Sequence, residues 1–203
     1  MINLQAVLKK TVVDGALVVL YGLFAQAHFV RFLESREPYL LLVVISESLV
    51  ALMFLIRRAD ISKSTSAAEW IVGIAGTFLP MLLRPSTVVI LPSVGSYVVA
   101  VGVFLQIGGL LSLNMSLGIV PANRGIRTTW MYRFVRHPLY ASYVVTFSGY
   151  LIANYSILNV LIVCGSLVLM LCRIFFEERH LLADHAYQHY AQSVRWRLIP
   201  YVF

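Results

Sequence analysis

Residues 157–176 read ILNVLIVCGSLVLMLCRIFF, and their composition indicates the class of protein to which the chain belongs. It contains one charged side chain, Arg173, close to its end. An α-helix needs about 20 predominantly apolar residues to cross a bilayer, because it must satisfy every backbone hydrogen bond within itself. The stretch therefore predicts a membrane-spanning helix.

Five further apolar stretches precede this one in the 203-residue chain. Hydrophobic residues make up 60% and charged residues 12% of the sequence, whereas soluble proteins have roughly 45–50% and 25%. The mean hydropathy of +0.82 agrees. We therefore expect an all-α polytopic membrane protein, a bundle of about six transmembrane helices. The expected spans are residues 12–32, 38–56, 67–83, 88–113, 139–153 and 157–176.

Basic residues in the connections predict the orientation, because short cytoplasmic loops carry an excess of Lys and Arg. If the N-terminus is cytoplasmic, only Arg31, Arg36 and Arg84 of the sixteen Lys and Arg residues fall on the opposite side. Both termini are therefore expected in the cytoplasm. The net charge of +7 is explained by topology and lipid headgroups, so nucleic acid is not an expected partner. A bacterial inner membrane is the default location, and an endoplasmic reticulum membrane would suit the same topology.

The chain divides by chemistry at residue 113. Residues 1–113 form a four-span region with short connections, whereas residues 114–203 contain a long basic linker, a helical hairpin and a polar tail. Gly95, Gly102 and Gly109 recur every seven residues, which places them on one helix face where a neighbouring backbone can approach closely. Cys164 and Cys172 lie in one apolar run, so neither a disulfide framework nor a metal site is expected.

Polar residues gather in two clusters that flank the final helical hairpin. The first cluster is Arg127, Tyr132, Arg133, Arg136, His137, Pro138 and Tyr140, and the second is Arg173, Glu177, Glu178, Arg179 and His180. The entry and exit of a helical hairpin lie on the same face of a membrane. We therefore expect the two clusters to meet at a functional site, since polar groups at a membrane boundary are costly unless they have a role.

Arg173 and Glu177 are four residues apart and so share one helix face. They are either an ordinary ion pair or two parts of a site, in which the guanidinium binds a carboxylate or phosphate and the carboxylate binds an amine or hydroxyls. Pro138 suits the first position of a helix, which places His137 at or next to the N-cap, where free N–H groups can receive an anion.

The C-terminal 90 residues or so resemble the isoprenylcysteine carboxyl methyltransferase family, whose superfamily also includes phospholipid N-methyltransferases. The similar stretches are SLGIVP (116–121), RGI (124–126), YRFVRHPLY (132–140), FEE (176–178), YQHY (187–190) and WRLIP (196–200). The resemblance implies an integral-membrane methyltransferase that binds S-adenosylmethionine in a cytoplasmic pocket formed by residues 114–203. Relatives commonly carry glycine where this chain has Trp130, and that ring would alter the mouth of the pocket.

The resemblance also implies residue roles. Arg173 matches the arginine that orients a substrate carboxylate, and Glu177 matches a glutamate that contacts the cofactor, so these two are the expected catalytic residues. The expected cofactor-binding residues are Ile126, Arg127, Tyr132, His137, Pro138, Leu139, Tyr140, Glu177 and Glu178.

The methyl acceptor is expected to be a lipophilic or lipidated molecule dissolved in the membrane. The first candidate is the carboxylate of an isoprenylcysteine-like substrate, because a carboxylate needs orientation but no base. The alternative is the amine of a phospholipid headgroup, for which Glu178 or a histidine would accept the proton. A hypothesis from another class is a transporter or scaffold that uses Glu47, His28 and Gln106 as an internal polar path.

Overall fold

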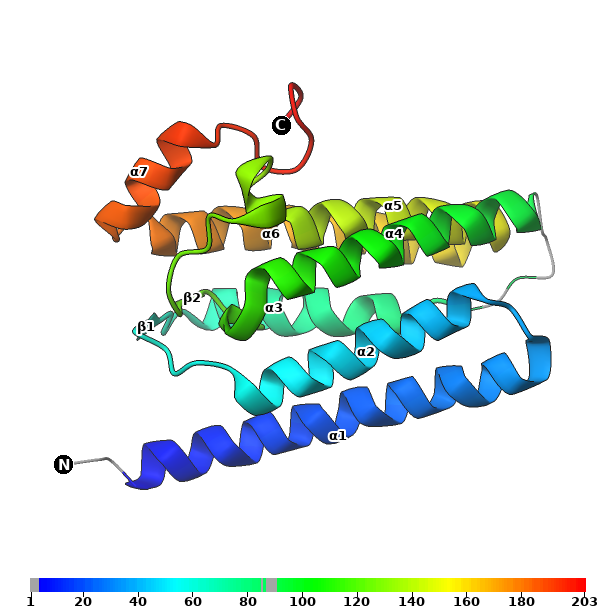
Figure 1. Ribbon diagram of the computed structural model, residues 1–203, viewed down its shortest axis with the longest axis horizontal. Coiled ribbons are helices and arrows are strands. Elements are labelled where there is room, and N and C mark those ends of the chain that lie inside the picture. Colours follow the sequence, from blue (N-terminus) through cyan, green and yellow to red (C-terminus); the bar gives the residue numbers. More distant parts are fainter. Residues whose placement is uncertain (1–3, 85, 87–90) are drawn as a thin grey trace.

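The computed structural model describes residues 4–84, 86 and 91–203 and is almost entirely helical there (Figure 1). This confirms the predicted all-α polytopic membrane fold. The helices are α1 (Leu4–Ser35), α2 (Tyr39–Ile56), α3 (Ala67–Phe78), α4 (Pro92–Leu113), α5 (Pro138–Ala153), α6 (Ile157–Leu181) and α7 (His185–Ser193). Short 3-10 turns are η1 (Leu79–Leu82), η2 (Asn114–Ser116) and η3 (Trp130–Arg133), and two short strands are β1 (Ser62–Lys63) and β2 (Ala122–Asn123).

Each of the six expected spans corresponds to a helix in the described part of the chain. Among the described residues, α1, α2, α4 and α6 are long and apolar enough to cross a membrane, whereas α3 with η1 is shorter. The 16 residues of α5 also fall short of the usual span length. The start of the fourth expected span, residues 88–90, lies outside the described residues. The helices run roughly side by side along the long axis of the molecule (Figure 1).

Close backbone contact joins α4 to α5, as the glycine spacing predicts. A Cβ atom added to Gly102 would lie 2.6 Å from the backbone nitrogen of Thr146, and one added to Gly95 would lie 2.6 Å from that of Ala153. From the other side, a Cβ on Gly149 would lie 2.6 Å from the nitrogen of Val99. Glycine is therefore required for these two helices to pack at this distance.

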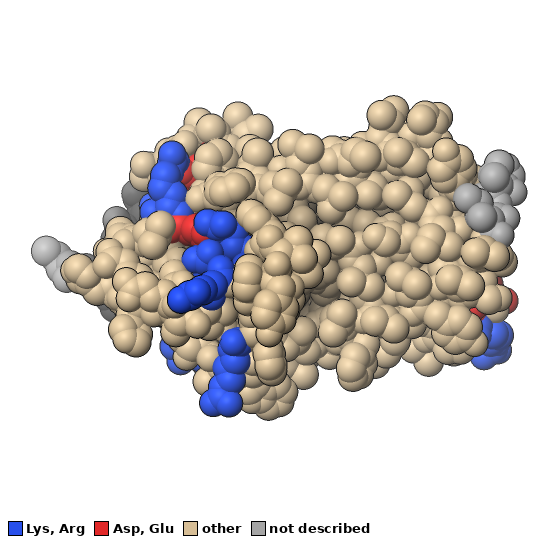
Figure 2. Space-filling model, turned by 90° about the horizontal axis from the view of Figure 1, so that it is seen from above, with Lys and Arg blue, Asp and Glu red and all other residues tan. Residues whose placement is uncertain are grey.

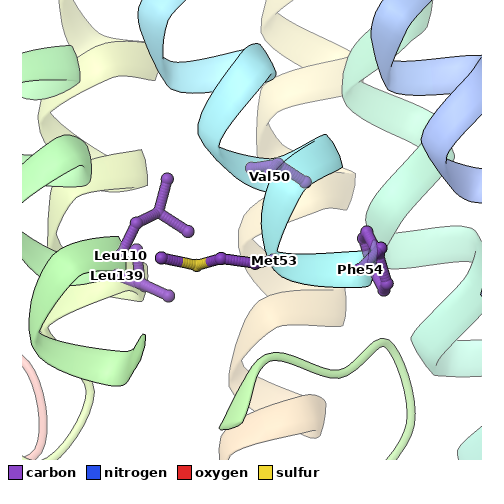
Figure 3. Packing of buried hydrophobic residues seen from close by; sticks show 5 residues of the cluster. All are labelled: Val50, Met53, Phe54, Leu110 and Leu139. Atoms are coloured by element: carbon purple, nitrogen blue, oxygen red, sulfur yellow. The ribbon is translucent and has the colours of Figure 1, made fainter. Parts of the chain in front are cut away.

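A cluster of buried apolar residues connects the two chemical regions of the chain (Figure 3). Val50, Met53 and Phe54 come from α2, and they pack with Leu110 of α4 and Leu139 of α5. Met53 points between the other helices toward Leu110 and Leu139 (Figure 3). Because Leu139 follows the RHP motif directly, this cluster holds the start of α5 against the N-terminal region.

The linker between α4 and α5 is fixed by the connection between α2 and α3. Strands β1 and β2 pair antiparallel, with Ser62 opposite Asn123 and Lys63 opposite Ala122. An ion pair of 2.6 Å between Asp60 and Arg124 reinforces the pairing. The basic linker between α4 and α5 therefore has a defined structure, which the sequence pattern did not predict.

Charged residues are concentrated at the ends of the molecule. Figure 2 shows Lys and Arg gathered at the end that holds α7, while the middle of the same face is uncharged. Many large hydrophobic side chains of the long helices are exposed, such as Leu55, Phe104 and Leu161. An uncharged apolar flank between charged ends is the surface expected of an integral membrane protein.

Candidate active site

A cavity lies where α5 begins and α6 ends, at the α7 end of the bundle in Figure 1. It encloses about 940 Å³, including the space of its open mouth. Its wall consists of Leu113, Ser116, Leu117, Gly118, Val120, Ala122, Arg124, Gly125, Ile126, Arg127, Tyr132, Arg136, His137, Leu139, Tyr140, Tyr143, Arg173, Glu177, Leu181, Tyr187 and Tyr190. The linker, the helical hairpin and α7 therefore share one cavity.

The RHP motif forms the start of α5 as predicted. His137 is the N-cap and Pro138 the first helical residue, a position where proline loses no hydrogen bond. The backbone N–H groups of Arg136 and His137 donate to the carbonyls of Trp196 and Arg197, both at 2.9 Å. The tail after α7 thus fixes the N-terminus of α5.

Glu177 connects the two polar clusters directly. The Tyr140 hydroxyl donates a short hydrogen bond to Glu177 Oε1 across 37 positions of sequence. The Nδ1 atom of His137 lies 3.9 Å from Glu177 Oε2. Two residues of the first cluster therefore meet the carboxylate of the second inside the cavity wall, in the arrangement expected from the hairpin.

Arg173 and Glu177 take separate partners. Arg173 Nη1 donates to Thr77 Oγ1 and Nη2 donates to the carbonyl of Ile119, both at 3.3 Å. The guanidinium also lies 5.4 Å from the ring centre of Tyr140, within range of a cation–π contact. Its buried Nε has no hydrogen-bond partner within the described part of the chain. The guanidinium thus faces the cavity with only neutral hydrogen-bond acceptors.

Thr77 is a site residue that the motifs did not indicate. It lies in α3, and a Cβ atom added to the preceding Gly76 would lie 3.1 Å from Arg173 Cδ. The N-terminal region therefore forms part of the wall behind Arg173. Thr77 and Gly76 belong to no recognisable motif. Their contact with Arg173 depends on how α3 packs against α6, which the sequence does not reveal.

The linker contributes a second cavity guanidinium. Arg127 Nε donates to Ser116 Oγ at 3.2 Å. Its buried Nη2 finds no hydrogen-bond partner among residues 4–84, 86 and 91–203. Arg124, in contrast, is paired with Asp60. Arg127 and Arg173 are thus two cavity arginines whose hydrogen bonds go to neutral oxygen atoms.

Tyrosines form much of the remaining wall. Burial raises the pKa values of Tyr132, Tyr187 and Tyr190, so these side chains stay neutral phenols. The Tyr190 hydroxyl donates to the Tyr132 carbonyl at 2.8 Å, which joins α7 to η3. Tyr143, which the motifs did not indicate, lines the cavity one helical turn after Tyr140. The cavity wall therefore combines neutral aromatic side chains with arginines.

The structure places most of the predicted site residues in the cavity wall. Those that line it are Ile126, Arg127, Tyr132, His137, Leu139, Tyr140, Arg173 and Glu177. Pro138 and Glu178 lie behind this wall, and both are buried. Pro138 shapes the helix start, while Glu178 contacts His137 from the far side.

Trp130, whose ring was expected to alter the cavity mouth, does not line the cavity. Its side chain is 69% exposed and lies outside the cavity wall. Its backbone has φ = 56°, a left-handed conformation that favours glycine. Glycine would adopt this conformation with less strain than tryptophan.

The residues of the cavity fit S-adenosylmethionine. An aromatic wall suits a sulfonium cation and an adenine ring, Glu177 suits hydroxyl or ammonium groups, and a buried arginine nitrogen without a partner suits a carboxylate. Within the described part of the chain, no group of three or more His, Cys, Asp or Glu residues could hold a metal ion.

The comparisons with known proteins agree with the motifs. The family model for phospholipid methyltransferase matches residues 90–189, which include α4, the linker, α5 and α6. A search of curated proteins found no match. The matched region contains every residue of the cavity wall except Tyr190. Residues 90–189 are therefore similar to the phospholipid methyltransferase family, and together with the long apolar helices this match supports an integral-membrane methyltransferase.

Proposed function

We propose that this protein transfers a methyl group from S-adenosylmethionine to the carboxylate of a membrane-dissolved, isoprenylcysteine-like acceptor. The single observation that supports this choice best is the environment of Arg173. Its guanidinium faces the cavity from a helix long and apolar enough to span a membrane, and it donates hydrogen bonds to the Thr77 hydroxyl and the Ile119 carbonyl. Its buried Nε has no hydrogen-bond partner among the described residues, and an acceptor carboxylate would form a charge-assisted hydrogen bond with the guanidinium.

The geometry gives Arg173 an orienting role. A guanidinium presents parallel N–H groups that match the two oxygens of a carboxylate. Thr77 and Ile119 hold Nη1 and Nη2, so the side chain is positioned before the acceptor arrives. Methylation of a carboxylate releases no proton from the acceptor, so the site needs orientation and exclusion of water but no base.

Different residues would hold the cofactor. Bound S-adenosylmethionine supplies an electrophilic methyl group on a sulfonium. Arg127, whose buried Nη2 has no partner among the described residues, would bind its carboxylate, and Glu177 would bind hydroxyl or ammonium groups. The buried tyrosines Tyr132 and Tyr187 would exclude water and face the cation with their rings.

Methylation of a phospholipid headgroup amine is the second candidate, and the family match favours it. Arg173 would then bind the lipid phosphate, since a guanidinium suits phosphate as well as carboxylate. An ammonium acceptor must lose a proton before it attacks. Glu177 is the carboxylate in the cavity wall that could accept it.

One experiment separates the two candidates. Membranes that contain the protein are incubated with cofactor labelled in its methyl group, and the lipid-soluble product is treated with mild base. A methyl ester releases volatile label, whereas a methylamine keeps it. Release would support the carboxylate acceptor, and base-stable label in a phospholipid would support the amine. Absence of cofactor binding by calorimetry to the folded protein at millimolar concentration would reject both.

We also propose that the cavity opens to the cytoplasm, with both termini on that side. The basic residues of the linker and of the segment that follows α6 lie at the cavity end. Cytoplasmic loops carry such an excess. A bacterial inner membrane remains the default, and the endoplasmic reticulum the alternative. The orientation is tested after Cys164 and Cys172 have been replaced by alanine. Single cysteines are then introduced at Tyr155 and Arg195 and labelled with an impermeant reagent, and only Arg195→Cys should be protected in intact cells.

A further inference from the structure

Glu178 is the most highly connected carboxylate at the cavity end, although it lies behind the cavity wall. Only 4% of its surface is exposed. Arg197 Nε donates to its Oε2 at 2.8 Å, and the Nε2 of His137 lies in hydrogen-bond contact with its Oε1 at 3.1 Å. Arg136 Nε lies 3.2 Å from Oε1, and the Tyr187 hydroxyl donates to the same atom at 3.5 Å.

These partners come from three separate segments of the chain. His137 and Arg136 precede α5, Tyr187 lies in α7, and Arg197 lies in the tail. Two main-chain hydrogen bonds run in parallel with the side-chain contacts, from the N–H groups of Arg136 and His137 to the carbonyls of residues 196 and 197. Glu178 thus occupies the point where the tail meets the start of α5.

The contact between Glu178 and His137 affects the cavity wall, because His137 lines the cavity. When Nε2–H donates to Glu178, the ring orientation is fixed and Nδ1 is left facing Glu177 Oε2, 3.9 Å away. The His137 ring also lies 5.6 Å from that of Tyr140, whose hydroxyl donates to Glu177. A change at Glu178 is therefore transmitted to two residues of the cavity wall without any contact between Glu178 and a ligand.

We propose that Glu178 is a positioning residue of the methyl-transfer site: it fixes the ring of His137 and the tail through Arg197, and so maintains the wall that receives the cofactor. The proposal rests on the proposed function, since it names how that site is held. It gives the two adjacent glutamates different tasks, with Glu177 in the cavity and Glu178 behind it.

The test compares two buried carboxylates. Glu178→Gln keeps the shape but cannot accept from both His137 and Arg197, because one side of the amide is a donor. The matched control is Glu69→Gln, since Glu69 is also buried and accepts from Arg179 Nη2 at 2.5 Å, away from the cavity. Cofactor affinity is measured by calorimetry in detergent, together with the thermal midpoint of each variant.

We expect Glu178→Gln to weaken cofactor binding about tenfold while the acceptor KM stays unchanged, because a charged hydrogen-bond partner is lost behind His137. Glu69→Gln should bind cofactor like the wild type, whatever its thermal midpoint. Equal cofactor affinity in both variants would overturn the proposal and leave Glu178 a purely structural residue. If the wild-type protein itself binds no cofactor, the proposed function fails instead.

A second variant covers the case in which Glu178→Gln does not fold. The Arg197 side chain is 32% exposed, so Arg197→Gln should disturb the fold less than a change at the buried Glu178 while removing one of its partners. We expect it to weaken cofactor binding about threefold, in the same direction as Glu178→Gln. Wild-type affinity in folded Arg197→Gln protein would contradict a role for the tail contact. Where both single variants fold, the double variant should be no weaker than Glu178→Gln alone.

Discussion

The α4–α5 contact and the cavity end are held together by different forces. Between α4 and α5, glycines such as Gly95 and Gly102 allow the backbones to touch, and shape alone decides the fit. At the cavity end, arginines, glutamates and tyrosines from distant segments meet through directed hydrogen bonds. The difference follows from depth, because unpaired charge is costly in hydrocarbon whereas the boundary can supply water and partners. Packing therefore holds the scaffold, and polar contacts hold the site.

The largest loss of stability is expected at the close contact between α4 and α5. Gly102→Val would place side-chain atoms against the backbone of Thr146, where a Cβ alone approaches to 2.6 Å. Overpacking of this kind costs about 1–3 kcal/mol or more. We expect loss of most folded protein, measured by size exclusion and thermal denaturation in detergent. The control is Gly22→Val in α1, where a Cβ meets nothing within 4 Å of the described residues. A folded, fully stable Gly102→Val protein would contradict the backbone contact.

The next largest effect is expected at Arg173. Arg173→Ala removes the guanidinium that would orient the acceptor, so acceptor kcat/KM should fall about 100-fold, equivalent to about 2.7 kcal/mol. Cofactor affinity should stay within about twofold of the wild type. Steady-state kinetics and calorimetry measure the two effects. Arg133→Ala is the control, because Arg133 is exposed and lies outside the cavity wall. Equal loss of both parameters would indicate collapse of the cavity and argue against an acceptor role.

A substitution of Glu177 should affect cofactor affinity more than acceptor use, the reverse of Arg173→Ala. Glu177→Gln can still accept from the Tyr140 hydroxyl, so the fold is kept while the negative charge is lost. We expect cofactor binding to weaken about tenfold, with a smaller change in acceptor KM. Tyr140→Phe is the companion variant, since it keeps the carboxylate and removes the donor. Unchanged cofactor affinity in well-folded Glu177→Gln protein would remove Glu177 from the cofactor site.

The smallest effect is expected from the ion pair that fixes the linker. Asp60→Asn weakens the contact to Arg124, but Asp60 is 25% exposed and water screens part of the charge. The free energy of unfolding should fall by about 1 kcal/mol, measured as a shift of the thermal midpoint. Glu34→Gln breaks the exposed pair with Arg31 and should change nothing measurable. A loss as large for Glu34→Gln as for Asp60→Asn would show that burial does not decide the value of these pairs.

Local rules explain why some features were predictable from the sequence. The apolar stretches specify helices, a repeat of seven places Gly95, Gly102 and Gly109 on one face, and proline after His137 specifies a helix start. The prediction that the two polar clusters meet also needed only chain order, since the ends of one helical hairpin lie on one face. Each of these inferences depends on neighbours within a few turns or on simple connectivity.

The partners of the polar residues depended on packing over long distances. The sequence offered an Arg173–Glu177 pair, but Arg173 instead contacts Thr77 and Ile119, which lie 96 and 54 positions away. The periodicity of apolar residues in a sequence cannot predict contacts between residues this far apart in the chain.

The same limit explains the two adjacent glutamates. The sequence alone placed Glu177 and Glu178 together as expected cofactor residues, because the motif presents them as a pair. Successive residues of a helix point about 100° apart, and only the positions of α5, α7 and the tail decide which one meets the cavity. The membrane helices and the glycine contact were therefore predictable from local sequence patterns. Tertiary structure decided which charges face the cavity and which support it from behind, because that depends on elements brought together only by folding.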